Sequence, residues 1–307
     1  MRVFNSFEAA SVIRNPVVTT GTFDGVHIGH KTILNRLNKL AREVDGESVL
    51  ITFHPHPRVV LYPESAGKGL KLISSREEKI ELLRKAGLNN LIIIEFTREF
   101  ARTTSEIFVS EYLHAILKAK VVVVGHNHHF GFNQEGDYRK LWEMRTKYGF
   151  EAEEIPMQEV QSEIVSSTKI REAISEGYIQ RANAYLDHYY IIIGNPVPST
   201  DNCFGSAIPI SYLPISEETK LTPASGVYAV TAAGEAFYSK AMAVVDNALP
   251  KELRVAVHFF DYDKTVPAKN ITLFFHKKIR DLNQIVSQGK AAANIKGAFE
   301  EINELIF

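Results

Sequence analysis

The stretch GTFDGVHIGH, residues 21 to 30, places two histidines where their spacing could do chemistry, just after a short apolar run. Gly21 and Gly25 permit tight turns and let main-chain N–H groups approach a ligand. Gly29 and His30 open an expected helix, whose unpaired N–H groups and dipole attract anions. His27 and His30 would flank the start of that helix and donate hydrogen bonds to one phosphate. The pattern therefore predicts a site for a triphosphate.

Two other interpretations of this H-x-G-H spacing stay open. The histidines could be surface residues beside a turn, or a zinc pair, although further zinc ligands are not evident nearby. The stretch is not a P-loop, because no G-K-[ST] follows the glycines. Asp24 is expected to be a turn residue rather than a metal ligand.

A second candidate phosphate site is the hydroxyl-rich segment SSTKIR, residues 166 to 171. Ser167 and Thr168 would lie at a helix start, where caps and free N–H groups gather, and Arg171 could bind phosphate oxygens in a bidentate way. The alternative is an ordinary helix cap followed by a surface arginine.

The elements that must position these residues alternate between strand and helix patterns over residues 1–183. Apolar runs predict strands, and apolar residues at helical spacing predict helices. Ser75 with Glu78 three residues later is typical of a capping box. The expected strands are 17–20, 48–53, 91–95 and 121–125, and the expected helices are 31–44, 75–86, 105–117 and 138–148. Nearly all-apolar strands alternating with helices indicate a doubly wound parallel sheet, a Rossmann-like fold. Ligands of such sheets lie at the carboxyl ends of the strands.

Residues 184–307 show a different pattern. Short strands joined by Pro, Gly and Asn turns are expected at 189–193, 226–231, 236–245, 254–260 and 271–276, with one terminal helix at 291–305. This succession predicts a small antiparallel β-barrel. The chain is therefore expected to form an α/β domain over 1–183 and a β-barrel domain over 184–307.

Composition describes an ordinary globular protein, with 45% hydrophobic and 23% charged residues and a net charge of -1. No block of basic residues predicts a nucleic-acid partner. Cys203 is the single cysteine, so an internal disulfide and a four-cysteine zinc site are excluded. The amino terminus does not look like a signal peptide, and the longest apolar runs are too short to span a bilayer. We expect a cytoplasmic protein without a membrane partner; its oligomeric state stays open.

The first motif and four later segments resemble the bacterial bifunctional riboflavin kinase/FAD synthetase family, within the nucleotidyltransferase superfamily. They are GTFDGVHIGH, TFHPHP (52–57), EFTREFARTTSEIFV (95–109), VVGHNHHFGFNQEGD (123–137) and SSTKIREAISEG (166–177). The segments occur in the order found in the family and cover the first half of the chain.

This resemblance implies FMN adenylylation, in which the FMN phosphate attacks the α-phosphate of ATP and expels pyrophosphate. A phosphate dianion is already nucleophilic, so alignment and charge stabilisation would supply most of the catalysis. The resemblance gives that role to His27, His30, the helix N-terminus and Mg²⁺ held with the ATP phosphates. It implies ATP binding by Gly21, Phe23, Gly25, Gly29, Ser167, Thr168 and Arg171.

Two loops are implied to contact the flavin. The TFHPHP loop would contribute His54, Pro55 and Pro57, although an ordinary strand-end turn is the alternative. The loop after residue 125 would contribute Asn127 and Phe130. Within it, His126, His128 and His129 could instead bind a metal, but no carboxylate or cysteine partner is identifiable.

The second half resembles the riboflavin kinase module unevenly. TPASGVYAV (222–230), HFFDYD (258–263) and KKIRD (277–281) match it, whereas the phosphate and metal loop G-R-x-x-G-x-P-T-A-N does not. Aligned on Pro209, Phe204 replaces the arginine, Ile210 the threonine and Tyr212 the asparagine. Ala256 replaces the glutamate expected to deprotonate the riboflavin hydroxyl. Since a kinase needs oxygen ligands and a carboxylate here, we predict a barrel without riboflavin kinase activity.

Three alternatives to this function stay open. The chain could be fully bifunctional, could transfer the nucleotide to another acceptor, or could be a non-catalytic regulator that binds flavin or nucleotide. Retention of both candidate phosphate sites argues against the regulator.

Overall fold

A computed structural model of the chain describes residues 1–126, 128–156, 159–160, 163–202, 208–235, 237–248, 254–260, 270–286 and 291–305. The chain divides into two compact units. The first unit comprises residues 1–70 and 79–165, and the second comprises 71–78 and 166–307. Helix α3 (Arg76–Lys85) therefore starts in the second unit and continues into the first.

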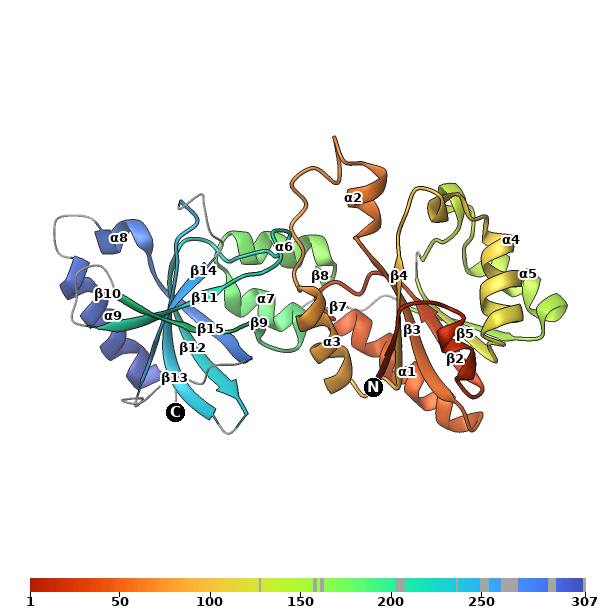
Figure 1. The fold of residues 1–307 in the computed structure, drawn as a ribbon, viewed down its shortest axis with the longest axis horizontal. Coiled ribbons are helices and arrows are strands. Elements are labelled where there is room, and N and C mark those ends of the chain that lie inside the picture. Colours follow the sequence, from red (N-terminus) through yellow and green to blue (C-terminus); the bar gives the residue numbers. More distant parts are fainter. Residues whose placement is uncertain are drawn as a thin grey trace. The chain divides into compact units, whose positions relative to one another are not determined.

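A parallel sheet is the centre of the first unit (Figure 1). Its strands are β1 (Arg2–Phe4), β2 (Pro16–Thr20), β3 (Glu47–His54), β4 (Asn90–Glu95), β5 (Val121–Gly125) and β6 (Glu151–Ile155). They lie in the order β1-β4-β3-β2-β5-β6, and every neighbouring pair is parallel. From β2 the chain builds the sheet in one direction through β3 and β4, and then crosses to β5 on the other side of β2. The topological switch therefore lies between β2 and β5, which is where doubly wound sheets bind ligands.

Helices and short turns cover this sheet. They are η1 (Ala9–Val12), α1 (Ile28–Glu43), α2 (Pro57–Leu61), α3, η2 (Phe100–Arg102), α4 (Ser105–Ile107), η3 (Phe108–Ile116), η4 (Phe132–Gln134) and α5 (Tyr138–Tyr148). A two-stranded ribbon, β7 (Glu159–Val160) with β8 (Glu163–Ile164), follows β6.

The strands are apolar on both faces because each face packs against helices. Val17, Leu50 and Leu91 belong to one buried cluster, which also contains residues of α1 and α3. Their neighbours Val18 and Val49 belong to the other cluster, together with residues of η3 and α5. This alternation is the pleat of a strand buried on both sides, and the predicted doubly wound sheet is confirmed.

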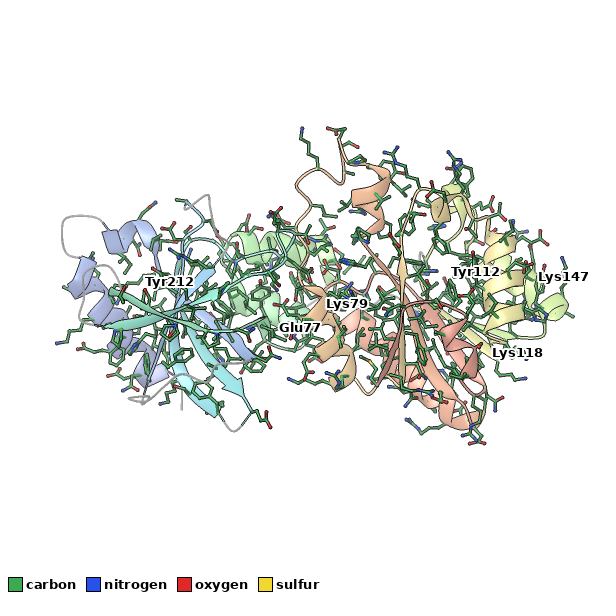
Figure 2. The ribbon with its side chains drawn as sticks, in the orientation of Figure 1. Glu77, Lys79, Tyr112, Lys118, Lys147 and Tyr212 are labelled. Carbon is green, nitrogen blue, oxygen red and sulfur yellow. The ribbon has the colours of Figure 1, made fainter. Side chains whose placement is uncertain are left out.

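The expected helix over 105–117 takes an unusual form. Its first turn, α4, is α-helical, and the following η3 is π-helical. Tyr112 on η3 packs its ring 4.4 Å from that of Phe7 (Figure 2). The sequence pattern did not predict β1 or β6; β6 reads EAEEI, and only Ala152 and Ile155 of this edge strand are buried.

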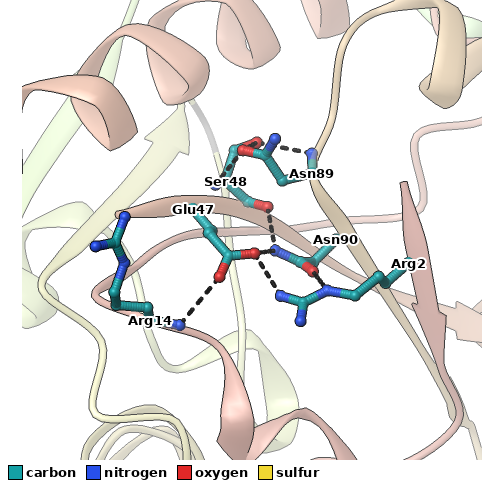
Figure 3. Close-up of polar contacts among 6 residues, drawn as sticks. All are labelled: Arg2, Arg14, Glu47, Ser48, Asn89 and Asn90. Carbon is teal, nitrogen blue, oxygen red and sulfur yellow. Dashed lines mark hydrogen bonds and ion pairs between the residues drawn. The ribbon is translucent and has the colours of Figure 1, made fainter. Parts of the chain in front are cut away.

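A polar cluster lies at the amino ends of β1, β3 and β4 (Figure 3), at the opposite edge of the sheet from the first motif. Arg2 Nε donates to Asn90 Oδ1 at 2.9 Å, and Asn90 Nδ2 donates to Glu47 Oε2 at 3.1 Å. Ser48 and Asn89 exchange further hydrogen bonds. Partial burial alone would raise the pKa of Glu47. The hydrogen bonds from Asn90 and from the Arg14 N–H, together with the charge of Arg2, outweigh that effect, so the pKa is lowered. These bonds join β1, β3 and β4, so we assign the cluster to stability.

The second unit is a curled antiparallel sheet with four helices among its described residues (Figure 1). Its elements are α6 (Ser167–Ser175), α7 (Ile179–Leu186), β9 (Tyr190–Gly194), β10 (Val197–Asn202), β11 (Pro209–Pro214), β12 (Gly226–Gly234), β13 (Phe237–Val245), β14 (Arg254–Phe259), β15 (Ile271–Asp281), α8 (Leu282–Val286) and α9 (Ala291–Leu305). The strand order is β10-β11-β14-β13-β12-β15-β9, with every neighbouring pair antiparallel. The antiparallel barrel-type sheet with a terminal helix is confirmed, while the short elements α7, β10, β11 and α8 were not predicted.

A buried ion pair lies in the second unit. Lys220 Nζ is 2.6 Å from Glu78 Oε2, and each side chain is 1% exposed. Lys220 also donates to the carbonyls of Ile73 and Ile191. Glu78 accepts hydrogen bonds from the N–H groups of Ser75 and Ile193, at 2.8 and 3.1 Å. Ser75 Oγ in turn accepts from Glu78 N, which confirms the predicted capping box.

No helix among the described residues is both long enough and apolar enough to cross a membrane.

Candidate functional site

The loop between β2 and α1 holds the first motif at the carboxyl end of the central strand. Gly21 N donates to Ile51 O on the neighbouring β3, which fixes the point where the loop leaves the sheet. Gly25 has φ +80°, and the non-glycine residues Phe23 and Val26 also have positive φ, at 45° and 44°. Positive φ at bulky residues is uncommon and costs about 1–3 kcal/mol per residue, so the surrounding contacts must hold this turn.

Three aromatic rings are stacked on this turn. The ring centres of His27 and His30 lie 3.6 Å apart, with an interplanar angle of 21°. The ring centre of Phe23 lies 4.4 Å from that of His30, with an interplanar angle of 22°. His27 is the N-cap residue of α1 and is 8% exposed, whereas His30 is half-buried in the first turn. The two imidazoles therefore flank the helix start, with Phe23 supporting one of them.

Burial lowers the pKa of His30 well below its usual value, and the charges of His27 and Lys79 lower it further. His30 is therefore neutral at pH 7 and offers one ring N–H as a donor. Its Nδ1 is buried and makes no hydrogen bond within the described part of the chain. An anion placed at the helix start would favour protonation of the ring and gain a hydrogen bond from it.

The first turn of α1 can receive such an anion. Its sequence has no acidic residue, and the described residues give it no side-chain cap. A Cβ at Gly29 would meet the His27 ring at 3.2 Å, so a glycine suits the close stacking at this point. A helix start with its dipole and two imidazoles beside it is the kind of place that binds a phosphate.

Lys79 on α3 also contributes to this site, and the sequence pattern did not single it out. Its Nζ donates to the carbonyl of Thr22, inside the motif, at 2.8 Å. The contact joins residues 57 positions apart, so no local spacing could have revealed it. The only sequence signal was a lysine near the start of a helix.

The predicted flavin residues of the TFHPHP loop follow β3, which neighbours β2 in the sheet. His54 ends the strand, and the His54–Pro55 peptide is cis; both residues are exposed. Pro57 is the first residue of α2, where His56 Nδ1 accepts a hydrogen bond from Arg58 N at 3.1 Å. Because β3 and β2 end at the same edge, this loop starts beside the first motif.

The other predicted flavin loop follows β5, on the opposite side of β2. Phe130 packs its ring 5.9 Å from that of Phe108, and its backbone pairs with Gly136. Gly131 has φ +77° and its Cα lies against Ser105, so a Cβ there would come within 2.5 Å of Ser105 N. Asn127 lies outside the described residues.

The histidines of this loop do not gather into a metal site. His126 Nδ1 lies 3.2 Å from the carboxylate of Glu154. Within the described ranges no group of three His, Cys, Asp or Glu side chains could hold a metal ion. The described residues therefore do not provide a protein cage for Mg²⁺ either. Mg²⁺ commonly binds through substrate phosphates instead.

His128 makes stability depend on pH. Burial, and then the charge of His129, lowers the pKa of His128 to about 4. The unfolded chain, with a pKa near ~6.5, takes up the proton first as the pH falls. The free energy of unfolding should therefore be unaffected by this group above pH ~6.5 and fall by about 3 kcal/mol between pH ~6.5 and ~4. Urea unfolding of the wild type and His128→Phe across this range checks the prediction, and the difference between them should change by that amount. A constant difference would contradict it; His114→Gln, at an exposed histidine of η3 that does not act on His128, is the control.

The second predicted phosphate segment belongs to the second unit and is described with it. Ser166 is the N-cap of α6 and accepts a hydrogen bond from Lys169 N at 3.4 Å. Ser167 is the first helical residue, Thr168 is exposed, and Arg171 is half-buried on the next turn. The expected helix start is present, and both the cap and the phosphate interpretations agree with it.

The positions expected to carry kinase chemistry face an apolar cluster in the second unit. Ile210 on β11 is buried in this cluster, and Tyr212 and Ala256 pack against it. Tyr212 and Ala256 are directly opposite each other on β11 and β14. The Arg254 guanidinium lies 3.8 Å from the centre of the Tyr212 ring. Phe204 lies outside the described residues.

Two known families match successive parts of the chain. The FAD synthetase family matches residues 10–169, and the riboflavin kinase family matches residues 189–306. A bifunctional riboflavin kinase/FMN adenylyltransferase of Listeria monocytogenes is 32% identical over 70% of this chain and 67% of its own length. The Haemophilus influenzae protein of the same description is 29% identical over 89% of this chain and 88% of its own. A second Listeria monocytogenes protein, described as an FAD synthetase, is 36% identical over 59% of this chain and 72% of its own.

A solved structure shares the fold over nearly the whole length. It is described as a macrolide-efflux protein from Streptococcus pneumoniae, with a TM-score of 0.82, 25% identity and coverage of 98% of both chains. The parallel sheet with its H-x-G-H turn, the antiparallel sheet and the two family matches together show that the chain belongs to the bacterial bifunctional riboflavin kinase/FAD synthetase family.

Proposed function

We propose that this protein is an FMN adenylyltransferase, with the reaction carried by residues 1–183, and that residues 184–307 form a kinase-like module without kinase activity. The observation that carries the first part is the stacked His27–His30 pair at the N-terminus of α1, located at the topological switch of the sheet. Such an edge, with a helix N-terminus beside it, suits a nucleotide polyphosphate. The FAD synthetase family match over residues 10–169 supports that choice.

In the proposed reaction an oxygen of the FMN phosphate attacks the α-phosphorus of ATP. A new phosphate–phosphate linkage forms, the bond to the β-phosphate oxygen breaks, and pyrophosphate leaves with the electron pair. No proton must be removed from a phosphate dianion, so the protein supplies alignment and charge stabilisation. His27, His30 and the first N–H groups of α1 would donate hydrogen bonds to the phosphate oxygens, where negative charge increases. Mg²⁺, bound to the ATP phosphates, supplies charge neutralisation.

The remaining predicted residues have binding roles in this proposal. ATP contacts would come from the main chain of Gly21, Phe23, Gly25 and Gly29 and from Ser167, Thr168 and Arg171. The flavin contacts would come from His54, Pro55, Pro57, Asn127 and Phe130, which belong to loops on either side of the first motif. The substrates are intracellular metabolites, so the proposal places the protein in the cytoplasm.

Loss of the kinase activity rests on the chemistry of three side chains. Ile210, Tyr212 and Ala256 occupy the positions for which the family pattern needs threonine, asparagine and glutamate. Ile210 is 8% exposed in an apolar cluster, and Ala256 has no group that could accept a proton. A hard cation needs oxygen ligands, and the riboflavin hydroxyl needs a carboxylate to orient it. The apolar cluster provides neither.

A flavin product assay tests both parts of the proposal. The protein is incubated with Mg²⁺-ATP and either FMN or riboflavin, and the flavins are separated by chromatography. We expect FAD from FMN and no FMN from riboflavin. FMN from riboflavin would show the fully bifunctional activity named for the relatives, and flavin binding without turnover would show a regulator instead. A bifunctional relative assayed in parallel confirms that both substrates are competent.

A further inference from the structure

Lys79 is a charged side chain outside the motif that contacts it. It lies on α3, half-buried (Figure 2), and its Nζ donates to Thr22 O at 2.8 Å. The hydroxyl of Thr52, on β3, approaches the same carbonyl at 3.4 Å. The ammonium bond is the shorter and the charge-assisted one, so it is the stronger constraint on the direction of this carbonyl.

The direction of the Thr22 carbonyl matters because the next residue is strained. Phe23 has φ 45°, a conformation that bulky residues avoid unless their surroundings fix it. Its ring is 3% exposed and lies against His30, which in turn lies against His27. Lys79, the Thr22 carbonyl and Phe23 thus form a continuous series of contacts that ends at the two imidazoles.

Helix α3 can hold Lys79 in place. Leu83, one turn further along α3, is fully buried in the cluster that also contains Phe23 and Leu34 of α1. The helix that carries Lys79 and the turn that it contacts therefore share one core. A donor on a rigid packed element positions its acceptor more accurately than a donor on a loop.

We propose that Lys79 is a positioning residue for adenylyl transfer, and that it fixes the 21–26 turn so that the His27–His30 pair is aligned for the triphosphate. This role rests on the proposed FMN adenylyltransferase function. Lys79 acts through Thr22 and Phe23 rather than by contact with substrate.

The positive charge of Lys79 also acts on the imidazole of His30. The groups whose charges act on His30 are His27, at the N-cap of α1, and Lys79, on α3; both lower the pKa of His30, after burial as the main cause. A fixed positive charge beside the rings adds to the effect of burial, which is the main reason that His30 is neutral in the free protein. It also makes the local potential more attractive to polyphosphate.

Three variants test the proposal. Lys79→Met removes the hydrogen-bond donor and the positive charge but keeps the length of the side chain. Lys79→Arg keeps the donor and the charge. Lys85→Met is the control, because it removes an exposed lysine of the same helix. For each we would measure kcat and KM for FAD formation, thermal unfolding, and the pKa of His30 by NMR of its ring C–H signals without ligand. Lys79→Met should lower kcat about tenfold or more, because small misplacements of aligned groups have effects of this order. It should also raise the pKa of His30, while the unfolding temperature changes little.

Lys79→Arg should recover most of kcat and the low pKa of His30, and Lys85→Met should match the wild type. The proposal would be overturned if Lys79→Met had the kcat and the His30 pKa of the wild type. It would also be overturned if Lys79→Met and Lys79→Arg lowered kcat equally. If the wild type made no FAD, the proposed function would fail, whereas the chemical shifts of the His30 ring C–H signals, which depend on the stacked Phe23 ring, would still show whether Lys79 positions the turn.

Discussion

Replacing His30 by alanine is expected to reduce FAD formation about a hundredfold or more, because the change removes a donor at the point where negative charge increases. Stability should change little, since His30 is half-buried on the first turn of α1 and its Nδ1 has no hydrogen-bond partner in the described part of the chain. The initial rate of FAD formation from FMN and Mg²⁺-ATP, with urea unfolding of the same preparation, measures both effects.

His114→Gln is the matched control for His30→Ala. His114 is exposed on η3, on the other side of the sheet from α1, and contacts the Tyr148 carbonyl at 2.8 Å. We expect this variant to retain the wild-type rate. If His30→Ala also retained it, the assignment of the phosphate site to the stacked pair would be wrong. A fall in rate that accompanied unfolding would instead identify the ring as a structural support.

Lys220→Met is expected to destabilise the second unit by about 3–5 kcal/mol, because it leaves the buried carboxylate of Glu78 without its counter-charge. The ammonium also has the Ile73 and Ile191 carbonyls as acceptors, and both would lose their charged donor. Urea unfolding at pH 7.5, with wild type and variant compared under identical conditions, measures the effect. Lys240→Met removes a half-buried lysine of β13 in the same unit and is expected to cost much less.

The double variant Glu78→Gln/Lys220→Met separates the buried charge from lost packing, because glutamine removes the charge and keeps an acceptor for the N–H groups of Ser75 and Ile193. With no uncompensated buried charge, the double variant should be clearly more stable than Lys220→Met. pH gives a second check. Burial raises the pKa of Glu78 and Lys220 opposes that effect, so loss of Lys220 raises the pKa further. A folded-state pKa above the unfolded value destabilises most at high pH, and the deficit of Lys220→Met should therefore shrink as the pH falls toward ~4.5. Equal deficits in the single and double variants would contradict this account.

The parts of this protein that local sequence could predict are those where side-chain period and turn chemistry decide the structure. The largely apolar strands β2 to β5 predicted a sheet covered on both faces, and the two core clusters confirm it. Ser75 and Glu78 predicted a helix start that the reciprocal hydrogen bonds confirm. Strands without a clear hydrophobic pattern, such as β6 and β10, lie at the sheet edges. An edge strand has a neighbouring strand on one side only, so fewer of its side chains must be apolar.

The candidate site was predicted only in part. Its residue types were visible in H-x-G-H, because glycines and histidines at a strand-to-helix turn have a local physical meaning. Their arrangement was not visible. The stacking of Phe23, His30 and His27, and the low pKa of His30, depend on burial by distant segments.

By itself, then, the sequence determined two folding patterns and indicated a candidate anion site between β2 and α1. It also has Ile210, Tyr212 and Ala256 where the kinase pattern needs threonine, asparagine and glutamate. Tertiary structure alone decided that Lys79 reaches Thr22 from a separate helix, and that Glu78 doubles as a helix cap and the partner of a buried lysine far along the chain. The physical reason is that caps, turns and hydrophobic periods act over a few residues. Burial and charge pairing instead depend on which segments the folded chain brings together, and that is not encoded in any short stretch.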